Sequence, residues 1–243
     1  MLIRVGLILF AATFTQGVVG FGMALVAMPL LAVSLGIRTA APLIALLGVF
    51  SPALIAWRYR RQLDWGEITP LAWGSVLGIP VGVTLLRLVD EQIVTLALGL
   101  VLIGYGLYAL RWAAPPWRGT ARAAFWLGFA GGVLSGAYNI GGPALVIYGS
   151  SRRWSPGAFK ANIQVLLVLH SITVVISHSL AGNFTGDVWE VLPVGLLATG
   201  AGTGSGLLMD RFVNEATFRR LVLLLLLALG ARLMQTSLAG LLA

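Results

Sequence analysis

Two glycine-rich segments carry the residue types in this sequence that are best suited to binding a ligand. Residues 17–22 read GVVGFG and residues 136–141 read GAYNIG, and each interrupts a long apolar stretch. Where a helix breaks and restarts, the first N–H groups of the new helix lack a partner within it, and the helix dipole adds partial positive charge. Such an end is a ready anion site. The alternative is that these glycines only allow helices to pack closely.

Polar side chains and further glycines surround the two breaks. The glycines would let a ligand approach the backbone, and neutral side-chain donors suit a tetrahedral or pyramidal oxyanion. Asn139 is the strongest single candidate, whereas each polar group taken alone also fits an interhelical hydrogen bond. Asn162 and Gln164, in a neighbouring apolar segment, could face the same cavity. The predicted substrate-binding residues are Gln16, Gly20, Phe21, Gly22, Tyr138, Asn139, Ile140, Gly141, Gly142, Asn162 and Gln164.

Few ionisable groups are available to such a site. His170 lies near the middle of an apolar segment, where it could carry a coupling proton or, alternatively, be a neutral histidine bonded to a neighbouring helix. Arg38 and Lys160 would stand at the two mouths of a pathway and attract anions, or act as interfacial anchors. No Asp or Glu lies mid-segment and the chain has no cysteine. We therefore predict no carboxylate relay, no metal site and no cofactor.

The elements that position these residues must lie in a membrane. Of the 243 residues, 58% are apolar and only 10% are charged, with a mean hydropathy of +0.94. Soluble domains are usually about a quarter charged. Apolar stretches of about 20 residues, the length that crosses a bilayer, recur along the chain. The net charge of +8 rests almost wholly on arginines that flank these stretches, so we expect lipid and not nucleic acid as the surroundings.

The sequence is also an internal repeat, with residues 1–112 and 119–243 as the halves, 113–118 as a linker, and a single membrane domain overall. Besides the two glycine-rich segments, Arg38 recurs as Lys160, and Gly78-x-x-x-Gly82 recurs as Gly202-x-x-x-Gly206. The order of these landmarks is kept, and their offset drifts only from 119 to 124 residues. Each half has four apolar segments, at about 3–36, 39–57, 67–87 and 92–111, and at about 121–150, 158–181, 187–209 and 216–238.

The first segment of each half is too long for one crossing. A helix of some 34 residues would be about 50 Å long, whereas the hydrocarbon core is about 30 Å thick. Because each of these segments has a glycine-rich break, we predict a re-entrant helix hairpin followed by three transmembrane helices. An odd number of crossings per half makes the repeats inverted, an architecture common among secondary transporters. The alternative is eight full spans.

The positive charges favour the hairpin prediction. With hairpins, twelve lysines and arginines fall on one face of the membrane and four on the other. With eight spans, they fall eight and eight. Cytoplasmic loops carry an excess of Lys and Arg, so the first distribution defines an orientation and the second does not. It places both termini outside, on the periplasmic side.

These residues and motifs resemble a known family. The GVVGFG segment followed by Pro29, and residues 135–143 in the second half (SGAYNIGGP), are similar to the paired glycine-rich motifs of the TauE/SafE sulfite exporters. The resemblance covers essentially the whole chain. It implies export or exchange of sulfite, sulfoacetate or another small organosulfonate anion by a secondary transporter. Because two broken hairpins that meet at mid-membrane suit alternating access, we predict that this mechanism moves the anion across the bacterial inner membrane.

Other classes of function fit the residues less well. A channel for small inorganic anions is the nearest alternative, although it needs a continuous wet pore. A membrane hydrolase is disfavoured, because neither Gly-x-Ser-x-Gly nor His-Glu-x-x-His is present and no acid lies near a histidine. We therefore predict that the chain is not an enzyme. Two small-residue motifs, at 78–82 and 202–206, predict close helix packing within one chain or across a homodimer.

Overall fold

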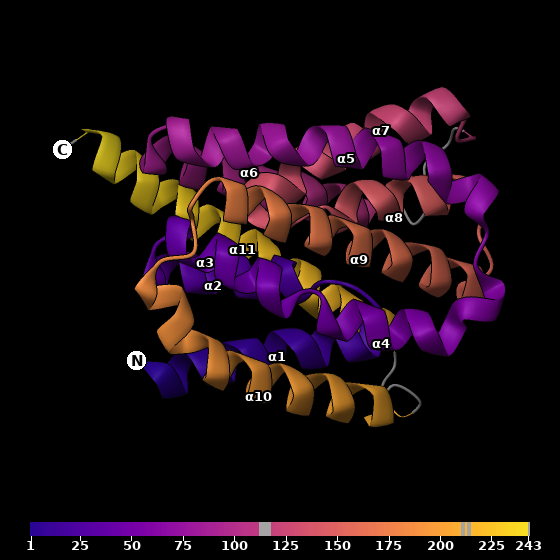
Figure 1. The fold of residues 1–243 in the computed structure, drawn as a ribbon, viewed down its shortest axis with the longest axis horizontal. Helices are drawn as coiled ribbons and strands as arrows, with labels where there is room; N and C mark the ends of the chain where they lie inside the picture. The colour runs from indigo at the N-terminus through magenta and orange to yellow at the C-terminus, as the bar shows by residue number, and fades with distance from the viewer. Residues whose placement is uncertain (112–117, 210–211, 213–214, 243) are drawn as a thin grey trace.

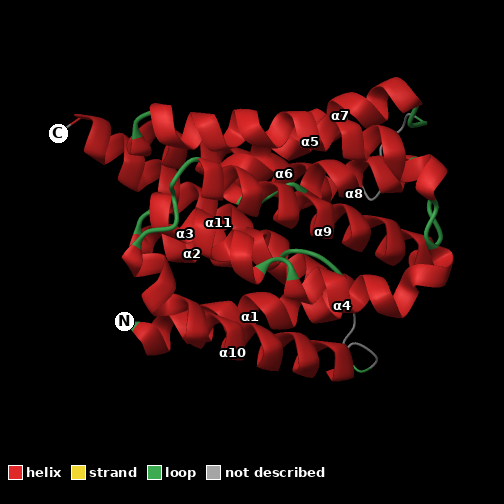
Figure 2. Cartoon of the chain, viewed as in Figure 1, coloured by secondary structure: helices red, strands yellow, loops and turns green. Residues whose placement is uncertain are grey.

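The computed structural model describes residues 1–111, 118–209, 212 and 215–242, so the predicted linker lies, except for Arg118, outside the described part. Within these ranges the chain forms eleven α-helices and one 3-10 turn and contains no strand (Figure 2). The prediction of an all-helical fold is therefore confirmed. The long helices run roughly alongside one another, and short loops join them at the two ends of the bundle (Figure 1).

Both predicted breaks are present. Helix α1 (Leu2–Val19) ends before Gly20, and α2 (Met23–Leu35) begins after Gly22. In the second half α7 (Ala121–Tyr138) ends before Asn139, and α8 (Gly142–Ser151) follows. The breaks are not central, because the first arm of each pair has 18 residues and the second arm has 13 or 10. The second arm packs back against the first in each pair.

The remaining helices include most of the candidate membrane spans. They are α3 (Ile37–Leu47), α4 (Phe50–Tyr59), the 3-10 turn η1 (Arg60–Gln62), α5 (Trp65–Leu88), α6 (Glu91–Arg111), α9 (Pro156–Leu180), α10 (Gly186–Met209) and α11 (Glu215–Leu242). Among the described residues, seven helices are long and apolar enough to cross a membrane when α3, α4 and η1 are counted as one. The seventh is α1, whose 18 residues make it about 27 Å long.

One interruption was not predicted. We expected a single span at 39–57, but α3 ends at Leu47 and α4 begins at Phe50. Proline has no N–H, so Pro52 leaves the carbonyl of Gly48, four residues earlier, without its helical donor. The hydroxyl of Ser171 on α9 donates to that carbonyl instead, at 2.9 Å. The corresponding helix of the second half, α9, is unbroken over 25 residues.

The two halves pack reciprocally. The first arm of each hairpin lies against the third apolar segment of the opposite half: α1 packs on α10 and α7 packs on α5, while α6 packs on α11. Both predicted small-residue motifs serve these contacts within one chain. A Cβ atom at Gly82 would overlap the carbonyl oxygen of Val133 on α7, and one at Gly206 would lie 2.6 Å from Phe14 O on α1.

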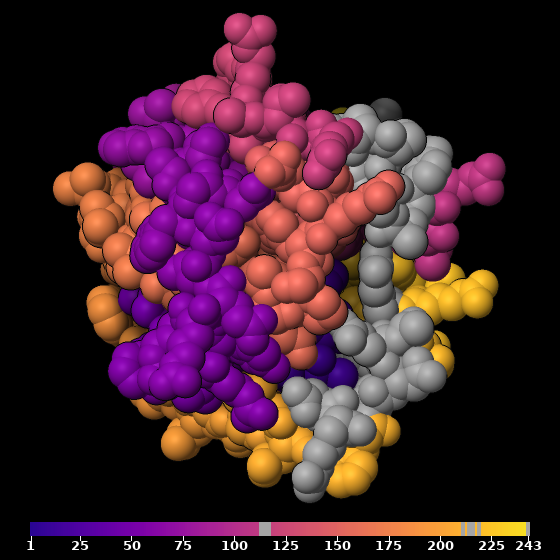
Figure 3. Space-filling model, turned by 90° about the vertical axis from the view of Figure 1, so that its right-hand side faces the viewer, coloured from indigo at the N-terminus to yellow at the C-terminus, as the bar shows by residue number. Residues whose placement is uncertain are grey.

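The halves are also joined at one end of the bundle. There, purple segments of the first half lie beside salmon segments of the second half (Figure 3). Arg152, just after α8, forms an ion pair with Glu67 of α5, and its Nε donates to Glu67 Oε2 at 2.8 Å. The indole N–H of Trp154 donates to the same oxygen at 3.1 Å. This is the one ion pair between side chains of the described residues.

Candidate functional site

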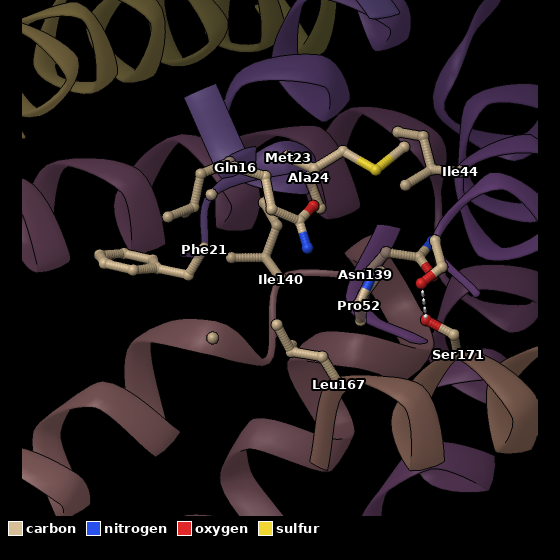
Figure 4. Close-up of a pocket in the computed structure, with 14 residues that line it drawn as sticks. Gln16, Phe21, Met23, Ala24, Ile44, Pro52, Asn139, Ile140, Leu167 and Ser171 are labelled. Carbon is tan, nitrogen blue, oxygen red and sulfur yellow. Dashed lines mark hydrogen bonds between the residues drawn. The ribbon is translucent and has the colours of Figure 1, made fainter. Parts of the chain in front are cut away.

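A cavity lies where the two breaks meet, with about 460 Å³ of empty space, part of it open to the surroundings (Figure 4). Six of the predicted binding residues line it: Gln16, Phe21, Gly22, Asn139, Ile140 and Gly142. The structure thus brings together residues that are more than 110 positions apart in the sequence. The cavity wall also contains residues that we did not predict: Met23, Ala24, Leu25, Ile44, Gly48, Pro52, Leu167 and Ser171.

The N-terminus of α2 forms one wall of the cavity. Gly22 and the first turn, Met23 to Leu25, all line it. Val26 is the first residue of α2 whose N–H has a carbonyl acceptor, Gly22 O at 3.1 Å. The N–H groups of the three residues before it point back along the axis toward the break, and no side chain caps them. Gly22 has φ +107°, a left-handed conformation that favours glycine.

The N-terminus of α8 approaches the same cavity from the second half. Gly142 is the first residue of this helix, and it lines the cavity. Pro143, next in the chain, has no N–H and is therefore suited to the first turn. A Cβ atom at Gly142 would meet no other atom within 4 Å, although the residue is buried. Empty space therefore lies directly beside the backbone here, and a ligand could approach it closely.

Gln16 places an amide in this space. Its side chain comes from the last turn of α1 and reaches between Ile140 and Asn139 (Figure 4). The residue is only 2% exposed, and its side-chain amide faces the cavity and makes no hydrogen bond to the described residues. A buried amide with unused hydrogen-bonding capacity is costly unless something binds it. Gln16 is thus the polar side chain most available to a ligand.

Asn139 has both a conformational and a polar role. It ends α7 with φ 57° and ψ 18°, the left-handed conformation that asparagine tolerates better than most residues. Its side-chain Nδ2 donates to the carbonyl of Ala41 on α3 at 2.7 Å. The NH₂ group has a second hydrogen that this bond does not use. Asn139 therefore ties the second break to the first half and retains one donor.

The other predicted polar residues are used in the scaffold around the cavity and do not line it. Gln164 Nε2 donates to the carbonyl of Gly20 and so holds the first break against α9. Asn162 Oδ1 accepts from the backbone N–H of Asp64 at 2.9 Å, at the start of α5. The Tyr138 hydroxyl donates to Val94 O at 2.9 Å. The bonds of Gln164 and Tyr138 connect the breaks to their neighbours, and that of Asn162 joins α9 to the start of α5. All three fit the interhelical alternative stated above.

His170 supports the second break from behind. Its Nδ1 lies 2.7 Å from the hydroxyl oxygen of Ser135 on α7, and both side chains are buried. A Cβ atom at Gly141 would overlap both of them, so this glycine packs on the pair instead of lining the cavity. The Nε2 atom of His170 is buried without a hydrogen-bond partner in the described part of the chain. The adjacent Ser171 does line the cavity.

The two predicted mouth residues differ in position. The aliphatic stem of Lys160 lies beside the first break, with its Cγ 3.7 Å from where a Cβ of Gly20 would be. Its Nζ lies 5.5 Å from the ring centroid of Tyr59, a cation–π contact. Arg38 is exposed in the first turn of α3. Neither side chain lines the cavity, whose wall contains no charged residue.

The residues that we missed had a partial signal in the sequence. Gly48 and Pro52 are helix-breaking residues four positions apart, a spacing that marks an interruption in a helix. Ser171 lies next to His170 in an apolar part of α9, so only its spatial position distinguishes it. The first turn of α2 is apolar in its side chains, and its contribution comes from the backbone.

Comparison with known proteins identifies the family. The sulfite exporter TauE/SafE family matches residues 5–233 of the chain. A relative from Cupriavidus necator, described as a probable sulfite/organosulfonate exporter TauE, is 27% identical over 241 residues, covering 93% of this chain and 91% of the relative. No solved structure matches the chain. The match and the seven apolar helices define a multi-pass membrane transporter and not an enzyme. The chain belongs to the sulfite exporter TauE/SafE family.

Proposed function

We propose that this protein is a secondary transporter that moves sulfite or a small organosulfonate across the bacterial inner membrane by alternating access. The observation that carries the proposal is the convergence of two helix N-termini, from α2 and α8, on one cavity between the halves. Unpaired N–H groups and the positive ends of two helix dipoles favour an anion. The relative's description as a sulfite/organosulfonate exporter supports the sulfur chemistry.

The binding site in this proposal combines backbone and side-chain donors. The N–H groups at the start of α2 and α8 bind the oxygens of the substrate, and Gln16 and Asn139 add amide N–H groups. Phe21 and Ile140 supply apolar walls that accommodate a short carbon chain. Gly20, Tyr138, Gly141 and Gln164 hold the two breaks in position around the ligand, and Asn162 joins α9 to the start of α5. Such a mixture of neutral donors and apolar surface is typical of a small-molecule site.

Alternating access follows in this proposal from the repeat. Residues 1–112 and 119–243 form two inverted repeats, both termini are periplasmic, and a substrate site at the junction of broken helices is the arrangement used by many secondary transporters. Lys160 and Arg38 attract the anion from opposite ends, and His170 is the group available to carry a coupling proton. The reciprocal packing of α1 on α10 and of α7 on α5 supports a two-fold relation between the halves.

The proposal is tested by transport into liposomes that contain the purified protein. Saturable uptake of sulfite or a sulfonate, accelerated by the same anion inside the liposome, is expected of a transporter. A channel would give uptake without this acceleration. If no sulfur oxyanion moves while the protein is folded and inserted, the proposed substrate is wrong.

A matched pair of variants tests the site itself. Gly142→Ala and Gly104→Ala both add a methyl group that meets no atom within 4 Å, but only Gly142 lines the cavity, whereas Gly104 lies exposed on α6. We expect Gly142→Ala to slow transport at least tenfold with little loss of stability, and Gly104→Ala to transport like the wild type. Equal transport by the two variants would remove this cavity from the proposal.

A further inference from the structure

The cavity compensates the charge of its ligand only by partial charges. None of the residues that line it is Lys, Arg, His, Asp or Glu. The positive contribution comes from the N-termini of α2 and α8, which have 13 and 10 residues, and each is equivalent to about half an elementary charge. Two such ends supply about one positive charge in total.

The opposite ends of the neighbouring helices do not add to this positive charge. Of α1, only Gln16 lines the cavity, and its backbone carbonyl already accepts the N–H of Gly20 at 2.8 Å. The carbonyl of Gly20 is occupied by Gln164. Where α3 ends and α4 begins, the two dipole ends are adjacent and largely cancel, and the Gly48 carbonyl is occupied by Ser171. About one unit is thus the positive charge that the helix ends contribute.

The Gln16 amide is an independent sign of a ligand here. Gln16 is only 2% exposed, and its amide reaches into the cavity (Figure 4). The amide makes no hydrogen bond to the described residues. An amide can donate to an anion without adding charge. A ligand with one negative charge would therefore find both its charge and its hydrogen bonds matched.

We propose that the transported species is the singly charged anion: hydrogen sulfite instead of the sulfite dianion, and sulfonates that carry no second negative group. This inference rests on the proposed function and specifies its substrate. The Born cost of moving an ion out of water rises with the square of its charge, so a dianion loses about four times as much hydration free energy as a monoanion of equal size. A cavity whose helix ends contribute about one unit of positive charge offsets this cost better for a monoanion than for a dianion.

Full charges near the cavity do not alter this assignment. The ionisable groups nearest to it, His170 and Lys160, both belong to α9. His170 is directed at Ser135, and Lys160 lies along Gly20 with its ammonium group at Tyr59. On the other elements around the cavity the cationic side chains are at or near the helix ends: Arg4 in α1, Arg38 in α3, Arg58 in α4 and Arg122 in α7.

The test compares anions of fixed and variable charge in liposomes containing the wild-type protein, with protein-free liposomes subtracted. Methanesulfonate carries one charge in all neutral buffers, sulfate and sulfoacetate carry two, and sulfite changes from one to two as the buffer becomes alkaline. We expect methanesulfonate transport to be independent of pH and at least tenfold faster than that of sulfate or sulfoacetate. At constant total sulfite, its transport should fall about tenfold per pH unit above the second pKa of sulfurous acid.

Each other outcome has a separate meaning. Transport of sulfate or sulfoacetate at the rate of methanesulfonate would overturn the charge assignment and leave the proposed function intact. If methanesulfonate transport falls with pH together with that of sulfite, a protein group such as His170 sets the dependence, and the assignment is again wrong. If none of these anions moves, the proposed function fails, and the inference fails with it.

A variant provides a second, independent test. Gln16→Lys places a full positive charge in the cavity, and Gln16→Met removes the amide without adding charge. We expect the ratio of sulfate to methanesulfonate transport to rise at least tenfold in Gln16→Lys relative to Gln16→Met. An unchanged ratio in a folded Gln16→Lys protein would overturn the inference, and the wild-type comparison decides the question if this variant does not fold.

Discussion

The double role of Asn139 can be separated by two substitutions. Asn139→Ala removes the amide and leaves an alanine in the left-handed conformation, with φ 57°. Asn139→Gly removes the same amide, but glycine adopts this conformation at no steric cost. Both variants lose the Nδ2 bond to Ala41 O. They differ only in backbone strain and in one methyl group.

The magnitudes follow from these two contributions. Loss of a side-chain hydrogen bond costs about 0.5–1.5 kcal/mol net. The left-handed conformation costs an alanine about a further 1–2 kcal/mol. We therefore expect Asn139→Ala to be less stable than Asn139→Gly by about 1–2 kcal/mol. For a chain of this size that difference corresponds to roughly 2–8 °C in Tm.

Thermal unfolding in detergent and transport in liposomes together test the reasoning. Stability should decrease from wild type to Asn139→Gly to Asn139→Ala, whereas transport should be reduced in both variants because both lack the amide at the cavity. Equal midpoints for the Gly and Ala variants would refute the conformational argument. Normal transport by Asn139→Gly would show that Asn139 serves the turn and does not contact the substrate.

Two further predictions concern the packing between the halves. Gly82→Ala should lower the stability by about 1–3 kcal/mol because its methyl group would overlap the α7 backbone. The control is Gly200→Ala, on an open face of α10, which should be neutral or stabilising. Equal Tm values for the two variants would contradict the close packing of α5 on α7. Glu67→Gln should weaken the charge-assisted bonds to Arg152 and lower the stability by about 1–2 kcal/mol, measured by thermal unfolding. Glu190, in the first turns of α10, is exposed and forms no ion pair among the described residues, so Glu190→Gln is the control and should leave the Tm unchanged.

The positions of the breaks were predictable from the sequence because they depend on local chemistry. Gly20, Gly22 and Asn139 all adopt positive φ, and these residue types are the ones that do so at low cost. Because the motif occurs at the same place in both halves, the repeat also predicted that the two breaks belong to one site. Six of the predicted residues do line one cavity.

The partners of individual side chains were not predictable in the same way. Asn162 and Gln164 are two positions apart on one helix, and residues with that spacing point in different directions. Each is bonded to a different neighbour, Asp64 in one case and Gly20 in the other. We missed the interruption between α3 and α4 because residues 39–57 form an apolar run long enough for one membrane span. That length favoured a continuous helix in spite of Gly48 and Pro52.

The reciprocal packing has a consequence for how the chain is made. Helix α1 emerges from the ribosome well before its packing partner α10, which begins only at Gly186. At usual rates of translation this leaves α1 and its hairpin without their final neighbour for about ten to thirty seconds. During that interval the N–H groups at the start of α2 and the glycines of α1 must be shielded by lipid, by the insertion machinery or by temporary neighbours. Biogenesis thus requires the first hairpin to wait for its final neighbour until α10 has been inserted.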